Sequence, residues 1–374
     1  MAIKIFHTAD LHLGMRFAGY PEIQNELINA RYETLEKMVA IANKEESDLF
    51  VIAGDLFDRV TVKAKEISRT VKILNEFNGE LVIVLPGNHD YYTSDSSLWE
   101  NFSQLAGDRI LVLKEPKIYD LSNYHLDAVV FSCPCSSKHS AENMLGWIKN
   151  NSINSDLLKI GIAHGSLEGV SPDFDKTYYP MTNKELEAIG LDLWLLGHTH
   201  LPWPERPDGK SRVFIPGTPE PDGFDCKHEG SAYIIKIDSP SKKKVQRIIT
   251  GKYRFLIKQI MLHNEDSIKR MEDEYCKEEY QNTILRLILK GRLKKEDLTK
   301  VKEATKSIEE KVVYFEVIQE ELNEEITSEL INSEFTQDSF PHQLLLSLLK
   351  EEGNVSNKAL QKAYDMIREI KNEN

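Results

Sequence analysis

The sequence predicts an α/β fold in which short buried strands alternate with amphipathic helices, followed by a smaller α+β unit and C-terminal helices. Five short apolar runs lie in the first two hundred residues, and polar residues follow each run directly. Segments with apolar residues at helical spacing separate the first three runs. Near Tyr253 the pattern changes to a shorter alternation of strands and helices, and no strand is expected beyond Glu324. The chain is therefore expected to contain three parts.

The first part, residues 1–250, is expected to form the largest domain. In chain order, its expected elements are a strand at 3–6, a helix at 21–46, a strand at 49–53, a helix at 62–77, and strands at 81–85, 159–163, 193–196 and 232–237. The three lysines Lys242, Lys243 and Lys244 are interpreted as an exposed turn, because charged side chains are rarely buried without partners.

The second and third parts follow after residue 253. Residues 253–320 are expected to form a compact α+β domain with strands at 255–262, 283–289 and 312–318 and helices at 265–279 and 296–310. Residues 324–374 are expected to be helical. Two apolar stripes, at 344–349 and 360–370, predict two helices separated by Glu352-Gly353-Asn354.

Composition places the chain among globular proteins. A length of 374 residues exceeds one ordinary core, and 41% hydrophobic with 29% charged residues is typical of a soluble protein. No apolar stretch approaches the roughly 20 residues of a membrane span, and the N-terminus lacks the layout of a signal peptide. Four cysteines without paired spacing favour a cytoplasmic location. The net charge of −13 argues mildly against nucleic-acid binding, although bound metal cations would offset part of it locally.

The polar residues after the five strands have the side chains of a metal site. They form the clusters Asp10-Leu11-His12, Gly54-Asp55-Leu56-Phe57-Asp58, Gly87-Asn88-His89-Asp90, Gly161-Ile162-Ala163-His164 and Gly197-His198-Thr199-His200. Open α/β sheets build active sites at the carboxyl ends of their strands, and carboxylate, amide and imidazole donors together suit a first-row divalent cation. Alternation along an extended strand end is expected to place Asp10 and His12 on the same side.

These donors predict two metal ions that share one carboxylate. The first ion is assigned Asp10, His12, Asp55 and His200, and the second is assigned Asp55, Asn88, His164 and His198. Two such ions can activate a hydroxide and stabilise the attacking and leaving oxygens of an in-line displacement at phosphorus. His89 is the candidate general acid, because it adjoins Asn88 but is free to face a substrate. Asp58 is expected to orient the His89 ring, and Asp90 to cap a helix or anchor the loop.

The sequence motifs in and around these clusters resemble those of the calcineurin-like metallophosphoesterase superfamily. Within it, they resemble the SbcD-type nucleases of DNA double-strand-break repair. The resemblance is carried by His-Thr-Ala-Asp-Leu-His-Leu-Gly (7–14), Ala-Gly-Asp-Leu-Phe-Asp (53–58), Pro-Gly-Asn-His-Asp (86–90) and Leu-Gly-His-Thr-His (196–200). Pro-Gly-Thr-Pro-Glu-Pro (216–221), with 230–233 after it, resembles the strand-turn-strand that follows the last histidines in this branch. Beyond residue 250 the resemblance is only architectural.

The resemblance implies a layered β-sandwich flanked by helices and a nuclease that depends on two Mn²⁺ ions. It implies 3′→5′ exonuclease action on duplex ends and endonuclease action on single strands, in DNA repair and recombination. Residues 253–320 would be a capping domain, and 324–374 would dock on the coiled-coil root of an SMC-like ATPase. Homodimerisation is implied through segments around 61–77 and 96–106. Archaeal and eukaryotic members carry histidine where this chain has Asp58, whereas bacterial members carry aspartate.

Two other functions remain open from the sequence. A different metallophosphoesterase, acting on a nucleotide, a cyclic nucleotide or a phosphoprotein, would use the same clusters but would not need the extension after residue 253. A non-catalytic scaffold for an ATPase would keep a vestigial site, which the complete ligand set and His89 argue against. At the C-terminus, one apolar stripe either docks on a partner or packs against the cap. It consists of Leu344, Leu345, Leu348 and Leu349.

Overall fold

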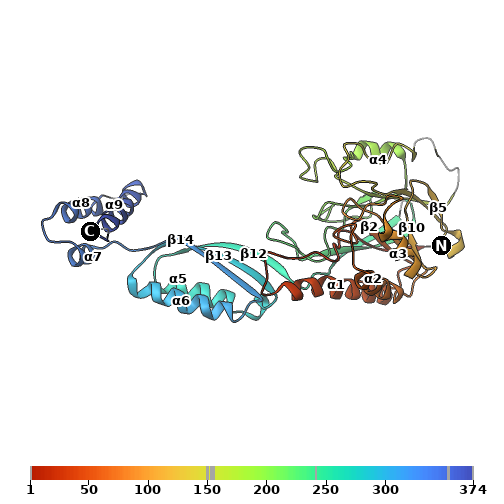
Figure 1. The fold of residues 1–374 in the computed structure, drawn as a ribbon. Coiled ribbons are helices and arrows are strands. Elements are labelled where there is room, and N and C mark those ends of the chain that lie inside the picture. The colour runs from red at the N-terminus through yellow and green to blue at the C-terminus, as the bar shows by residue number, and fades with distance from the viewer. Residues whose placement is uncertain (1, 149–150, 152–155, 241, 352–353, 373–374) are drawn as a thin grey trace. The chain divides into compact units, whose positions relative to one another are not determined.

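The computed structural model describes residues 2–148, 151, 156–240, 242–351 and 354–372 (Figure 1). Contacts within the chain divide it into two compact units. The first consists of residues 1–256 with 282–284, and the second of residues 257–281 with 285–374. Among the described residues, no helix is long and apolar enough to cross a membrane.

The first unit contains two mixed β-sheets. The six-stranded sheet has the order β11-β10-β1-β2-β3-β4. Its strands are β1 (Ile3–Thr8), β2 (Leu49–Ala53), β3 (Leu81–Leu85), β4 (Ile110–Val112), β10 (Ser231–Ser239) and β11 (Lys242–Ile249). The five-stranded sheet has the order β5-β6-β7-β8-β9. Its strands are β5 (Ile118–Asp120), β6 (Ala128–Cys133), β7 (Leu158–His164), β8 (Leu193–Gly197) and β9 (Val213–Phe214). β1 to β4 run parallel, as do β6 to β9.

Four layers build this unit. Side chains from the facing sides of both sheets, such as Val51 and Ile83 from one and Ile162 from the other, share one buried cluster. The opposite face of the first sheet is buried by α1 (Gln24–Lys44), α2 (Ala64–Asn75) and α3 (Ser97–Leu105), and that of the second by α4 (Asn183–Ile189) (Figure 1). A strand between two apolar layers is buried on both faces, which explains why β2 and β3 are continuous apolar runs. The predicted α/β fold class is confirmed.

One predicted turn of this unit is wrong. Lys242 to Lys244 open strand β11 instead of forming an exposed turn, and they pair antiparallel with the end of β10. Alternate residues of a strand face opposite sides of a sheet. Lys243 is therefore buried, and its ammonium group donates to the carbonyl of Pro240. The lysine run reflects an edge strand, where charged side chains discourage pairing with another chain.

The second unit joins a small sheet to a set of helices. The sheet has the order β12-β13-β14. Its strands are β12 (Arg254–Leu262), β13 (Thr283–Leu293) and β14 (Tyr314–Glu324). The first residues of β12 belong to the first unit. Helices α5 (Glu265–Tyr275) and α6 (Lys295–Glu309) lie side by side (Figure 1). Short 3₁₀ turns occur at Ser122–Tyr124 in the first unit and Glu278–Tyr280 here.

The C-terminal helices pack on each other through the predicted apolar stripe. They are α7 (Ser328–Glu334), α8 (Phe340–Leu349) and α9 (Asn354–Asn372), and α7 was not predicted. Leu345 is fully buried, and Leu348 and Leu349 pack against the same cluster, which also contains Tyr364 of α9. The predicted break at Glu352-Gly353 lies outside the described residues. Most of the stripe therefore holds helices together and does not offer a free docking face.

Candidate metal centre

The two sheets bring the carboxyl ends of five strands together. Asp10, Asp55 and Asn88 follow β1, β2 and β3 of the first sheet, while His164 ends β7 and His198 follows β8 of the second. Because the strands of each set run parallel, their carboxyl ends lie at one edge of each sheet. Every residue predicted for the site lies in this region, although their chemical roles remain predictions.

The first two candidate ligands, Asp10 and His12, lie on a left-handed backbone and not on an extended strand end. β1 ends at Thr8, and the φ angles of Asp10 and His12 are 57° and 46°. The extended arrangement predicted for this pair is therefore wrong. The main-chain N–H of Asp10 donates to the main-chain carbonyl of Gly54 (3.1 Å), and the N–H of His12 donates to the main-chain carbonyl of Asp55 (3.0 Å). The segment therefore stays hydrogen-bonded to the chain after β2 while it turns. Left-handed non-glycine residues cost about 1–3 kcal/mol each and persist where the surroundings fix them, often at functional sites.

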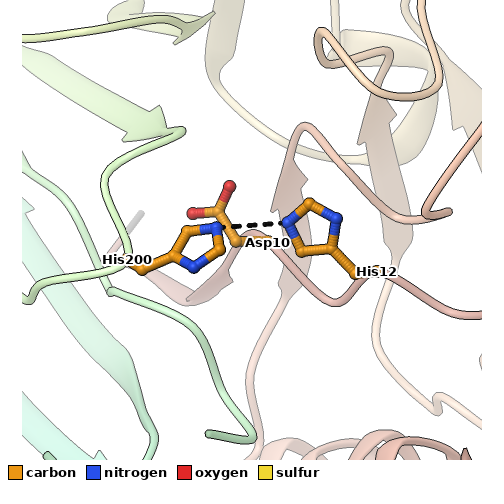
Figure 2. A group of neighbouring side chains, drawn as sticks. All are labelled: Asp10, His12 and His200. Carbon is orange, nitrogen blue, oxygen red and sulfur yellow. Dashed lines mark hydrogen bonds between the residues drawn. The ribbon is translucent and has the colours of Figure 1, made fainter. Parts of the chain in front are cut away.

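The first donor set consists of Asp10, His12 and His200 (Figure 2). Their candidate ligand atoms all lie within 4.8 Å of one another. Figure 2 shows the two imidazole rings approaching each other, and their Nε2 atoms are 3.2 Å apart. The Asp10 carboxylate accepts the main-chain N–H of His198, with Oδ1 at 2.9 Å and Oδ2 at 3.1 Å. This bond ties the first sheet to the loop that carries His200.

The second donor set consists of Asn88, His164 and His198. Oδ1 of Asn88 lies 2.9 Å from Nε2 of His164 and 3.0 Å from Nδ1 of His198. Asp55 lies between the two sets, because its Oδ2 is 3.2 Å from Nε2 of His164 and 3.8 Å from Nε2 of His12. A single carboxylate thus reaches both groups of donors, as a shared ligand must.

Two glycines let these segments approach so closely. Gly54 has a φ of 97°, and a Cβ there would overlap the ring of His164. A Cβ at Gly87 would overlap the carboxylate of Asp55. Both positions therefore require glycine for space, and Gly54 also requires it for its backbone conformation.

Burial and charge pairing act against each other in the site. Burial lowers the pKa of His164, but the Asp55 carboxylate outweighs this and raises the pKa to about 9. Burial, reinforced by neighbouring His164, lowers the pKa of His198 to about 3. Burial likewise holds the pKa of His12 well below its ordinary value and raises that of the Asp10 carboxyl. His12 and His198 are therefore neutral at pH 7 and present a lone pair, which a metal ligand requires, while His164 would give up its proton to a cation.

The donor sets fit two divalent cations. In both sets, atoms that carry lone pairs approach from different strands to 3.2 Å or less, and such atoms repel unless a proton or a cation lies between them. Nδ2 of Asn88 is buried without a hydrogen-bond partner among the described residues, while its oxygen faces the two imidazoles. Oxygen and imidazole donors in this mixture suit Mn²⁺, Fe²⁺ or Zn²⁺.

His89 lies beside both sets. Its main-chain N–H donates to Oδ1 of Asp55 (2.8 Å), and its ring meets the ring of His12 edge-on at 4.7 Å. Nδ1 of His89 is 3.1 Å from the main-chain carbonyl oxygen of Asp58. The Asp58 carboxylate instead pairs with Arg59 at 2.9 Å and lies 4.0 Å from Nδ1 of His12. Asp58 therefore contacts His89 through its main chain, and not through the carboxylate that the sequence suggested.

Other polar residues support the site without belonging to either donor set. The Asp90 carboxylate accepts the main-chain N–H groups of Phe57 (2.9 Å) and Gly87 (2.7 Å), so it anchors the loops, one of its two expected roles. Sequence reasoning missed Asp222, whose Oδ2 lies 3.3 Å from Nδ1 of His200. Its one sequence signal is that it follows the Pro-Gly-Thr-Pro-Glu-Pro element.

Comparison with protein families decides the class of this site. Residues 3–202 match the model of the calcineurin-like phosphoesterase family, and all five polar clusters lie within this range. The chain belongs to the calcineurin-like phosphoesterase family. It is accordingly a metal-dependent phosphoesterase, and this calcineurin-like phosphoesterase has the α/β architecture described above.

Curated relatives of this calcineurin-like phosphoesterase are about a quarter identical to it over the regions that align. The DNA double-strand break repair protein Mre11 of Saccharolobus solfataricus is 26% identical over 79% of this chain and 77% of its own length. The SbcD subunit of the SbcCD nuclease of Staphylococcus epidermidis is 27% identical over 54% of this chain and 58% of its own. An uncharacterized metallophosphoesterase, YhaO of Bacillus subtilis, is 26% identical over 53% of this chain and 48% of its own. The chain thus spans from about half to about three quarters of the length of these relatives.

Proposed function

We propose that the chain is a DNA nuclease of the SbcD type, which hydrolyses phosphodiester bonds with two divalent cations, Mn²⁺ in particular. One observation carries the proposal: two donor sets share the Asp55 carboxylate, and a histidine outside both sets, His89, lies beside them. Two of the relatives described above are named as a nuclease subunit and as a DNA double-strand break repair protein, which supports DNA as the substrate.

The chain's own residues would divide the work as follows. Asp10, His12, Asp55 and His200 would hold one cation, and Asp55, Asn88, His164 and His198 the other. Bound cations supply Lewis-acid stabilisation of the charge that develops on the phosphoryl oxygens. As an imidazolium, His89 would donate its Nδ1–H to the Asp58 carbonyl and keep its Nε2–H to protonate the departing oxygen. The Asp58 carbonyl would fix the ring in that orientation.

The later parts of the chain complete the proposal. Residues 1–250 would be the nuclease domain, 253–320 a capping domain and 324–374 a segment that docks on an SMC-like ATPase. The division of contacts near Leu256 supports the first boundary. Phe340 and Met366, which expose 77% and 53% of their surface, leave apolar side chains for a partner where the buried Leu345 does not. Homodimerisation is proposed through α2 and α3, where Leu105 is half exposed.

The test is degradation of a linear duplex labelled at either end, with and without Mn²⁺, beside bis-p-nitrophenyl phosphate as a small diester. We expect Mn²⁺-dependent loss of the 3′ label first, and cleavage of single strands. His89→Ala should lower turnover by about 10²–10⁴-fold while two ions still bind. His263→Ala, at an exposed histidine of the second unit, is the matched control and should keep full activity.

Two outcomes would contradict the proposal. Hydrolysis of the small diester with intact DNA would favour the alternative, a phosphoesterase acting on a nucleotide, a cyclic nucleotide or a phosphoprotein, and the uncharacterized relative from Bacillus subtilis keeps that alternative open. A loss of bound metal in His89→Ala equal to that caused by replacing Asp55 would show that His89 is a ligand and not the acid. The candidate ligand atoms of His12, Asp55 and His89 lie within 4.8 Å of one another, so the metal content of His89→Ala distinguishes a ligand from an acid.

A further inference from the structure

The Pro-Gly-Thr-Pro-Glu-Pro element leads to a carboxylate that neither donor set uses. Asp222 follows this element directly, and its side chain is 13% exposed. The hydroxyl of Thr218 within the element donates to the main-chain carbonyl of Asp10 (3.0 Å), so the element is fixed to the site. Asp222 therefore stands at a defined place beside the first donor set.

The Asp222 carboxylate faces the outer nitrogen of His200. Its Oδ2 lies 3.3 Å from Nδ1 of His200, while Nε2 of the same ring points toward His12. A neutral imidazole carries a single N–H, and a carboxylate can only accept a hydrogen bond. When Nδ1 donates to Asp222, the lone pair of Nε2 is directed toward the first donor set. The main-chain carbonyl of His200 is held as well, because Nε2 of His228 lies 2.5 Å from it.

A buried arginine connects Asp222 to the other side of the same set. One terminal nitrogen of Arg31, Nη2, lies 3.5 Å from Oδ2 of Asp222, and the other, Nη1, donates to the main-chain carbonyl of Leu11 at 2.5 Å. Leu11 separates Asp10 from His12. The Arg31 side chain is 1% exposed, so its charge needs an opposite charge nearby, and the Asp222 carboxylate supplies one. A purely structural ion pair would need no contact with His200, and the 3.3 Å approach is what distinguishes this arrangement.

We propose that Asp222 is a positioning residue that fixes the tautomer and orientation of His200 toward the first cation, and that Arg31 couples Asp222 to the segment carrying Asp10 and His12. This inference rests on the proposed metal site. A carboxylate that accepts the second N–H of a ligating histidine orients the ring and raises its basicity, and loss of such a partner typically weakens metal binding by about 10–100-fold.

The test is calorimetric titration of Mn²⁺ into the full-length metal-free protein. We expect Asp222→Asn to weaken the binding of one Mn²⁺ ion by about 10–100-fold and to change the affinity for the other by less than about threefold. Asp225→Asn is the matched control, because Asp222 and Asp225 both line a cavity of about 330 Å³ and Asp225 is exposed. It should bind both ions like the wild type.

A double-mutant cycle separates positioning from general packing. If Asp222 acts through His200, His200→Ala already removes its effect on Mn²⁺ affinity. Adding Asp222→Asn to His200→Ala should then lower the affinity by less than a further factor of about three. An equal loss in both backgrounds, or Mn²⁺ binding by Asp222→Asn within threefold of the wild type, would overturn the inference while leaving the metal site intact. A wild type that binds no Mn²⁺ would overturn the proposed function and this inference with it. If Asp222→Asn does not fold, Asp222→Glu keeps the charge beside Arg31 and should fold with a smaller loss; unchanged affinity there would overturn the inference.

Discussion

The two units of the chain handle charge in different ways. The first unit buries the carboxylates Asp10, Asp55, Asp90 and Glu220 almost completely. Of the side chains described in the second unit, no carboxylate is buried; its acidic groups lie at the surface, as in the ion pairs Arg286–Glu316 (2.8 Å) and Lys290–Glu321 (2.6 Å). Burying a charge costs several kcal/mol unless it is paired or binds a cation. The first unit therefore contains buried carboxylates that need hydrogen-bond partners or cations, whereas the second keeps its carboxylates where water can solvate them.

The backbone shows the same difference. Asp10, His12, Asp55 and His198 adopt positive φ angles at the strand ends of the first unit, whereas Asp338 is the non-glycine residue that does so in the described part of the second. Strain of this kind is tolerated where the surroundings hold it and a site needs it. Replacing site residues should thus cost activity far more than stability, and the reverse should hold in the second unit.

The largest effect is expected from Asp55→Asn. Loss of the shared carboxylate should lower kcat/KM by roughly 10³-fold or more, which corresponds to about 4 kcal/mol of transition-state stabilisation. The unfolding free energy of the metal-free first unit should change by less than about 1 kcal/mol, because a buried charge is removed together with the charge on His164 that it induces. Tryptophan fluorescence measures this, since Trp99, Trp147, Trp194 and Trp203 all lie in the first unit.

Asp225→Asn, which removes an exposed carboxylate near the same site, is the control and should leave both quantities unchanged. Activity of Asp55→Asn within tenfold of the wild type would show that the carboxylate is not shared. A large loss of stability would show that Asp55 holds the fold together, and the contrast between the units would then fail.

The second effect is expected from Leu345→Ala, which should lower stability and leave activity unchanged. Leu345 is fully buried in the cluster of α7, α8 and α9, so its truncation should destabilise these helices by about 2–5 kcal/mol. Far-ultraviolet circular dichroism should show an earlier transition, while the tryptophan transition and hydrolysis of a small diester stay unchanged. Leu344→Ala, at a partly exposed position of the same helix, should cost much less. A matching shift in both signals would show that the units unfold as one.

Sequence reasoning was most successful where a periodic pattern meets a functional constraint. Strands β2 and β3 were predicted to the residue, because a run buried on both faces is bounded sharply by polar residues. Asp10, His12, Asn88 and His164 could be proposed as donors because each follows such a run, and the structure brings them close together. The α+β order of residues 253–320 was also confirmed, since its alternation is regular.

What the sequence could not show depends on contacts between distant segments. Strand β4 has three residues and β9 has two, too few for a period to be recognised. The left-handed turns at Asp10 and His12 arise from hydrogen bonds to the segment after β2, more than forty residues away. Asp222 was missed because its partners, Arg31 and His200, are distant in sequence. A single aspartate after a proline carries no pattern of its own.

The third prediction concerns pH and His7, a fully buried residue of β1. Burial lowers the pKa of His7 from 6.5 to about 3. Because the folded pKa lies below the unfolded one, the neutral ring contributes its full stability above pH 6.5, and this contribution is lost as the pH falls toward 3. The loss amounts to roughly 1.4 kcal/mol per pH unit. His7→Leu cannot take up the proton, so its unfolding free energy should rise relative to that of the wild type as the pH falls below 6.5.

Urea unfolding of the metal-free protein, followed by tryptophan fluorescence at pH 7, 6 and 5, measures this difference. The control is His263→Leu in the second unit, whose exposed ring should leave the pH dependence of the first unit unchanged. A gap between His7→Leu and the wild type that stays constant with pH would show that His7 is not the group that titrates.

The smallest effect is expected from Glu316→Gln, which breaks the ion pair with Arg286. The two side chains are 37% and 30% exposed, so water and salt screen their attraction. The second unit should lose no more than about 1 kcal/mol, and the loss should shrink further in high salt. Glu320→Gln, at an exposed carboxylate of the same strand, makes the same change in charge and gives the reference value. Circular dichroism melts in low and high salt measure both. A loss well above the reference that persists in high salt would mean that this pair is effectively buried, and the second unit would then resemble the first in how it carries charge.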